Sequence, residues 1–176
     1  MRALGPGSVS SFLKVILDVF YYVLWVSAVL VALAVLALLL VSFNPHVIPA
    51  HLYGQIWVMG QAPGPGAAAL LTVAEAYLIG IVVIVQRLRR IFATMTAGDP
   101  FHPDNVRRLR VIGLVLALME IDRYISHAFE RFVLHAPPRS GEGASLTAWF
   151  AVLVIVVLYE VFREGARLRR DAELTI

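Results

Sequence analysis

Residues 25–41 form an apolar run with no charged side chain and a single serine, Ser27. With the residues before it, from Tyr21 onward, the run is long enough for an α-helix to cross about 30 Å of hydrocarbon, which takes ~20 residues. The whole chain is 60% hydrophobic and 15% charged, whereas average soluble domains are ~45–50% apolar and ~25% charged. The sequence therefore predicts a membrane protein.

The first apolar segment, residues 12–43, has two interpretations: an uncleaved membrane span and a cleaved signal peptide. Its apolar core is longer than the ~7–15 residues of a signal peptide, and no small-residue cleavage site follows it. Lys14 and Asp18 precede the core, and Tyr21, Tyr22 and Trp25 lie where an aromatic belt contacts the inner membrane interface. We expect an uncleaved first span.

Two more segments, residues 67–86 and 146–162, are apolar enough to cross a membrane, although Glu75 interrupts the first. Residues 44–66 contain no lysine, arginine, aspartate or glutamate, which is typical of a loop on the outer side.

The stretch 86–110 holds six arginines and is flanked by apolar segments. Short loops rich in arginine stay in the cytoplasm, so residues 87–108 are predicted to form a cytoplasmic hairpin. Within it, Gly98 is a candidate helix stop, and Pro103 suits the first position of the next helix, with Asp104 in its first turn.

Residues 109–134 are predicted to be a third span in chain order by a topological argument, because six ionisable residues follow its apolar part 111–119. The basic tail after residue 162 should share a side with the basic hairpin, which requires two crossings between them. The proposed inner side then holds twelve lysines and arginines, and the outer loops hold only Arg139. The fold-class prediction is an all-α, polytopic membrane protein. It is a single domain (1–176), a four-transmembrane-helix bundle with cytoplasmic N- and C-termini and a cytoplasmic C-terminal helix, residues 163–176.

Ionisable residues gather on the third span, mostly on one helical stripe because they recur every three or four residues. Charges at membrane depth usually face the bundle interior in pairs, and Glu75 is placed to meet Arg123 or His127. The stripe is either a proton- or ligand-linked site or a set of structural ion pairs, and the sequence leaves both interpretations open. The predicted intramembrane polar cluster comprises Glu75, Glu120, Asp122, Arg123, His127, Glu130 and Arg131.

Signals of catalysis and of metal binding are missing from the sequence. There is no Walker loop, GxSxG or GxGxxG, no HExxH and no cysteine. His46, His51, His127 and His135 with Glu130 could in principle ligate a metal or haem, but they lack the spacing of a metal site. We expect no enzymatic activity, no metal and no cofactor, and keep a haem- or metal-binding protein as the weakest hypothesis.

Two segments resemble a bacterial family of four-span integral-membrane proteins of unknown function. The first is Gly98-Asp99-Pro100-Phe101 followed by residues 105–113, NVRRLRVIG, and the second is residues 160–176, EVFREGARLRRDAELTI. Members of that family are often encoded beside a small Cro/CI-type helix-turn-helix regulator. The resemblance implies a protein of the bacterial inner membrane that holds or releases such a regulator.

The leading hypothesis from the sequence is a membrane sensor or anchor that binds a small DNA-binding regulator through two cytoplasmic segments. The alternative is a small transporter or a ligand- or ion-binding protein that uses the intramembrane charges. The expected partners are the lipid bilayer and the regulator, with no direct nucleic-acid binding, and self-association stays open. The predicted cytoplasmic interaction residues are Arg87, Arg89, Arg90, Phe101, Asn105, Arg107, Arg108, Arg110, Glu160, Arg163, Arg167 and Arg170.

Overall fold

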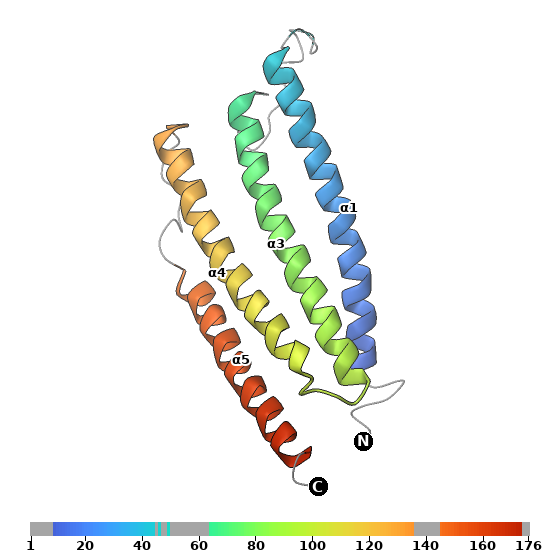
Figure 1. Cartoon of the computed structure of the whole chain (residues 1–176). Helices are drawn as coiled ribbons and strands as arrows, with labels where there is room; N and C mark the ends of the chain where they lie inside the picture. Colours follow the sequence, from blue (N-terminus) through green and yellow to red (C-terminus); the bar gives the residue numbers. More distant parts are fainter. Residues whose placement is uncertain (1–8, 45, 47–48, 50–63, 136–144, 174–176) are drawn as a thin grey trace. The chain divides into compact units, whose positions relative to one another are not determined.

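The computed structural model describes residues 9–44, 46, 49, 64–135 and 145–173. Four long helices account for most of these residues: α1 (Val9–Phe43), α3 (Pro65–Thr96), α4 (Pro103–Phe132) and α5 (Leu146–Glu173) (Figure 1). No β-strand occurs in the described part of the chain. The predicted all-α class is therefore confirmed.

Three of the helices are long and apolar enough to cross a membrane, over Phe12–Phe43, Pro65–Thr96 and Leu146–Asp171. None of the residues in the most apolar window of α5 is buried, and only about a tenth of those in the window of α1 are. Apolar surface of this extent, left uncovered by protein, suits contact with lipid and indicates a membrane protein.

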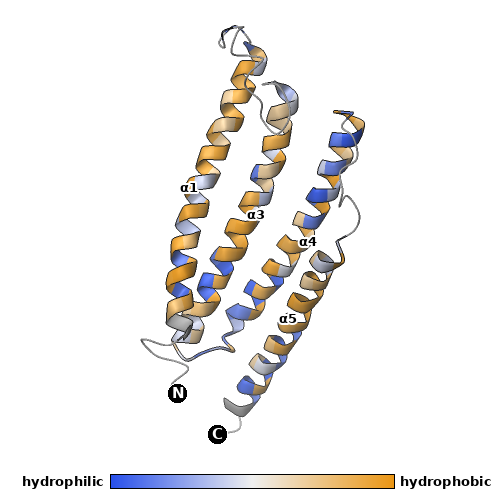
Figure 2. Cartoon of the chain, turned by 180° about the vertical axis from the view of Figure 1, so that it is seen from behind, coloured by the Kyte–Doolittle hydropathy of each residue, from blue (hydrophilic) through white to orange (hydrophobic). Residues whose placement is uncertain are grey.

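Helix α4 is not among these three long apolar helices. Hydrophilic residues recur along its C-terminal half, whereas α1 is hydrophobic over most of its length (Figure 2). The crossing expected over residues 109–134 therefore stays a prediction.

The chain divides into two compact units, and each long helix except α5 contributes to both. The first unit contains Met1–Val23, Gly80–Glu120 and Gly143–Ile176, and the second contains Leu24–Ile79 and Ile121–Glu142. The beginning of α1, the connection from α3 to α4 and the whole of α5 thus belong to the first unit.

The core of the first unit forms where α3, α4 and α5 meet. Ile91 of α3 contacts Leu109 and Ile112 of α4, and all three side chains are buried. Apolar residues of α5 pack against this cluster, namely Ile155, Tyr159 and Phe162.

Glycines allow α4 to approach both of its neighbours in the first unit. A Cβ atom on Gly113 would lie 3.2 Å from Cγ2 of Ile155 in α5, and one on Gly80 of α3 would lie 2.8 Å from the Met119 side chain. Because apolar attraction between helices is weak in lipid, membrane helices associate largely through such close contacts at small residues.

The second unit has a smaller buried cluster. Leu38 of α1 packs against Ala67 and Ala68 at the start of α3, with Leu71 beside them. Two alanines at this contact again bring helix backbones close together.

We predict that Gly113→Val lowers the thermal midpoint of the protein in detergent micelles, corresponding to a loss of about 1–3 kcal/mol, because the added methyl groups overpack the contact with Ile155. The control is Leu114→Val, since Leu114 is the exposed neighbour of Gly113 on the same helix. Equal midpoints for the two variants would contradict a close α4–α5 contact at Gly113.

Candidate interaction surface at the α3–α4 hairpin

The end of α3 is determined by Gly98. Its φ of 84° lies in the left-handed region, which costs a glycine little because it has no Cβ. The Gly98 amide donates to the Met95 carbonyl at 3.1 Å, and the Asp99 amide donates to the Thr94 carbonyl at 3.0 Å. This pair of bonds is a Schellman motif, so the predicted helix stop at Gly98 is confirmed.

The start of α4 is determined by His102 and Pro103. The His102 side chain accepts a hydrogen bond at Nδ1 from the Asp104 amide at 3.2 Å, and its carbonyl accepts one from the Asn105 amide at 2.8 Å. Pro103 occupies the first helical position, where no amide donor is needed. Asp104 lies in the first turn, where its negative charge interacts favourably with the positive end of the helix dipole. The predicted helix start is confirmed.

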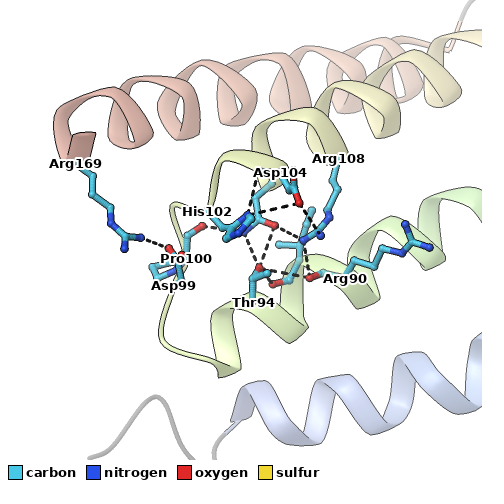
Figure 3. A network of polar contacts seen from close by, with 10 residues as sticks. Arg90, Thr94, Asp99, Pro100, His102, Asp104, Arg108 and Arg169 are labelled. Atoms are coloured by element: carbon cyan, nitrogen blue, oxygen red, sulfur yellow. Dashed lines mark hydrogen bonds and ion pairs between the residues drawn. The ribbon is translucent and has the colours of Figure 1, made fainter. Parts of the chain in front are cut away.

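Asn105 ties the two helix ends together. Its side chain is 0% exposed, and its Nδ2 donates to Thr94 Oγ1 at 2.8 Å and to the Pro100 carbonyl at 3.0 Å. Its Oδ1 accepts a hydrogen bond from Arg108 Nη1 at 2.8 Å, and the same nitrogen donates to the Arg90 carbonyl at 3.0 Å. Figure 3 shows Thr94, Pro100 and Arg108 in this network, with Arg90 contributing its backbone carbonyl. The hairpin is therefore closed by a buried polar group with both ends of its amide satisfied.

Helix α5 is attached to this hairpin by an aromatic contact and an ion pair. The Phe101 ring lies 5.6 Å from the Phe162 ring, centroid to centroid. It also covers Gly165, where a Cβ atom would lie 2.6 Å from Phe101 Cδ1. Asp99 forms an ion pair with Arg169, drawn in Figure 3. Residues 98–101 and the C-terminal part of α5 therefore form one contact.

The beginning of α1 is attached to α3 by Arg89. Its guanidinium pairs with Asp18 and lies 4.3 Å from the ring centroid of Tyr21 and 5.7 Å from that of Tyr22. Arginine over an aromatic face is attracted by the ring quadrupole. Asp18 and the two tyrosines are thus partners of a basic side chain in the hairpin arm.

Four arginines line a pocket of about 350 Å³ beside the hairpin, which we call the arginine pocket. Arg87 and Arg90 come from α3, and Arg107 and Arg108 come from α4. The remaining lining residues are Asp104 and Val111. Arg87 and Arg90 are three residues apart, so they lie on one side of α3, whereas Arg107 and Arg108 are consecutive residues of α4.

The predicted interaction residues on α5 lie on its exposed side. Glu160 pairs with Arg163 at 2.9 Å, and Glu164 pairs with Arg167 at 2.8 Å. Both pairs form within α5, because residues three positions apart are neighbours on one face of a helix. Arg170, like these four, is exposed.

Two predicted interaction residues of the hairpin have roles other than direct contact with a partner. Asn105 is fully buried and so supports the surface from within. Phe101 is 40% exposed, and its covered part contacts α5. Arg110 is exposed.

The predicted intramembrane cluster is divided between the two units. Glu120 belongs to the first unit and is buried, and the other six residues belong to the second. Among the described residues, no hydrogen-bond partner faces the buried atoms Glu75 Oε2 and His127 Nδ1. The Arg123 guanidinium lies 5.1 Å from the centroid of its neighbour Tyr124. Arg131 is exposed, and Asp122 and Glu130 are partly buried.

The histidines were considered as metal ligands in the sequence. His46 and His135 are exposed, and His51 lies outside the described residues. Within the described ranges, no three histidine, aspartate or glutamate side chains gather closely enough to hold a metal ion.

Comparison with known protein families matches residues 52–176, a stretch that includes the hairpin, α4 and α5. The matching family is described as Protein of unknown function (DUF2975). The chain belongs to the DUF2975 family. No match was found among curated proteins or among solved structures.

The structure adds residues that the sequence interpretation missed in this family member. Thr94 and Arg169 complete the hairpin contacts, Gly165 makes room for Phe101, and Asp18 pairs with Arg89. Asp99 was part of a recognised motif, but its partner lies 70 residues away in the sequence. No spacing rule for one helix finds such a pair. Gly165 could have been noticed, because it is a glycine inside an otherwise strong helical pattern.

We predict that Asn105→Ala lowers the free energy of unfolding by about 2–3 kcal/mol, because the partly buried Pro100 carbonyl and the Thr94 and Arg108 side chains each lose a partner. Denaturant unfolding in micelles measures this change, and faster amide hydrogen exchange at Gly98 and Asp99 should accompany it. Arg110→Ala, an exposed change on the same helix, is the control. If both variants are equally stable, Asn105 does not hold the hairpin.

Proposed function

We propose that this DUF2975 protein is a non-enzymatic membrane anchor that presents a cytoplasmic docking platform to a small helix-turn-helix regulator. The platform consists of the α3–α4 hairpin and the exposed side of α5 from Glu160 onward. The single observation that carries the proposal is the contact of residues 98–101 with Phe162, Gly165 and Arg169, which joins the two segments that resemble the regulator-associated family.

The proposed orientation places the hairpin and both termini in the cytoplasm of a bacterial cell, with four crossings of the inner membrane. Its basis is the positive-inside rule applied to the six arginines of residues 86–110 and the basic tail. In this topology the start of α1, the hairpin and the tail share one side of the membrane, and all three belong to the first compact unit. In this arrangement α4 is the remaining crossing. Charges at membrane depth usually face protein rather than lipid, and Glu120 of α4 is buried, whereas Arg131 near its end is exposed.

A rigid platform favours protein binding because little conformational entropy is lost when a partner docks. The hairpin is held by the Schellman motif, the His102 cap and the buried Asn105, and α5 is held by Phe101. The exposed ion pairs Glu160–Arg163 and Glu164–Arg167 are worth little to stability. Their arginines can therefore pair with acidic groups of a partner at small cost to the fold.

We predict that the full-length protein in detergent captures a helix-turn-helix regulator encoded beside its gene, and that Arg163→Gln with Arg167→Gln weakens capture several-fold by removing two exposed cations. The control removes two exposed cations outside both segments, Lys14→Gln with Arg131→Gln, and should leave capture unchanged. The regulator retained on the tagged protein is quantified after washing.

A second variant, Gly165→Val, tests the platform itself. It leaves every charge in place but displaces Phe101, so capture should fall although the arginines are intact. The proposal is wrong if the wild type captures no regulator, or if capture survives both Gly165→Val and the removal of Arg163 and Arg167.

A specific observation supports a second candidate function, a small transporter or ion-binding protein. Glu75 Oε2 and His127 Nδ1 are buried without hydrogen-bond partners in the described part of the chain. Unsatisfied buried polar atoms are costly, and ionisable residues at membrane depth commonly mark ion or proton pathways. Both residues belong to the second unit, whereas the docking platform belongs to the first.

For this candidate we predict a proton flux in proteoliposomes, followed with an internal pH-sensitive dye, that Glu75→Gln reduces at least tenfold by removing the titratable carboxyl group. Glu164→Gln, an exposed change on α5, should leave the flux unchanged. Wild-type vesicles that are no more permeable than empty ones would dismiss the transport function.

A further inference from the structure

The arginine pocket has an excess of positive charge that the described residues do not neutralise. Its lining contains four arginines and one aspartate, a formal charge of +3. Arg108 is already engaged, because it bonds to Asn105 and lies 3.6 Å from Asp104. The one acidic residue of the lining, Asp104, therefore pairs with Arg108, the arginine that also has other partners.

The other three arginines of the pocket have no ion pair and no side-chain hydrogen bond among the described residues. One of them has a specific deficit: Arg87 Nε is buried and faces no acceptor. A buried donor attached to a charged group is costly unless an acceptor reaches it. Arg87, Arg90 and Arg107 thus provide donors from two helices around one pocket.

The chemistry of the lining favours a phosphate group as the occupant. Guanidinium groups present paired N–H donors that match the oxygens of a phosphate, and several arginines can share one such group. At about 350 Å³ the pocket lies at the lower end of the range for small-ligand sites. One phosphate with a short ester substituent is a suitable guest.

The position of the pocket favours a lipid as the source of the phosphate. Arg87 and Arg90 follow the apolar part of α3, and Val111, where the apolar part of α4 begins, also lines the pocket. Basic pockets at the cytoplasmic ends of membrane helices bind anionic headgroups. We infer that Arg87, Arg90 and Arg107 form a binding site for the phosphate of an anionic phospholipid headgroup, a site on the hairpin part of the proposed docking platform that α3 and α4 line.

The test uses full-length protein in detergent and compares added phosphatidylglycerol, phosphatidylcholine and inorganic phosphate, the last against chloride at equal ionic strength. Lipid retained in native mass spectrometry and the shift of the thermal midpoint are measured. Phosphatidylglycerol should be retained more tightly than phosphatidylcholine. Arg107→Gln should weaken its retention about tenfold, the expected effect of losing one charge-assisted contact.

The matched control is Arg110→Gln, which removes an equal charge from the same helix, one turn away and outside the pocket. Arg107 and Arg110 are both exposed, so both variants should fold, and Arg87→Gln then tests the buried donor. Stabilisation by inorganic phosphate that Arg107→Gln abolishes, with no further gain from phosphatidylglycerol, supports the phosphate site with a soluble source. The inference is overturned if Arg107→Gln and Arg110→Gln lose lipid retention equally. It is also overturned if the wild type prefers neither phosphatidylglycerol over phosphatidylcholine nor phosphate over chloride.

Regulator capture is measured in parallel so that the two proposals can fail separately. Loss of lipid retention in Arg107→Gln with capture intact supports the phosphate site alone. Loss of capture in Arg163→Gln with Arg167→Gln, at unchanged lipid retention, supports docking alone.

Discussion

The packing of the Phe101 ring against Gly165 is the contact on which the arrangement of the first unit depends. It is possible only because α5 has no side chain at that position: a Cβ there would lie 2.6 Å from the ring. The Asp99–Arg169 ion pair lies beside it. A partly exposed ion pair adds at most about 1 kcal/mol, whereas an aromatic pair adds about 0.5–1.5 kcal/mol beyond its buried area. The Phe101 ring therefore contributes more than the ion pair to holding α5 against the hairpin.

The four consecutive hairpin residues 98–101 each make a different contribution to the structure. Gly98 supplies the left-handed turn that ends α3, and Asp99 reaches Arg169. Pro100 offers its carbonyl to Asn105, and Phe101 contacts α5. A short motif of this kind is recognisable in a sequence because every position has a separate requirement, and changing any one removes a different contact.

The elements of the fold could be predicted from the sequence because they follow from local chemistry. Apolar length gave the three long apolar helices, and Gly98 and Pro103 gave the hairpin boundaries. The partners across the first unit could not be predicted, since Asp18 meets Arg89 and Asp99 meets Arg169 over separations of about 70 residues. Asn105 was assigned to the interaction surface as part of the recognised motif, yet it is buried, since the two helix ends need a group that both donates and accepts.

The distribution of arginines has two separable physical consequences. Orientation in the membrane depends on how many cations a loop carries and is indifferent to where their side chains point. A binding site depends instead on position: particular guanidinium groups must converge on one place and lack intramolecular partners. Arg89 and Arg108 have intramolecular partners and Arg110 lies outside the arginine pocket, so they satisfy only the first requirement. Arg87, Arg90 and Arg107 satisfy both, and for that reason positive-inside topology alone does not account for their placement around one pocket.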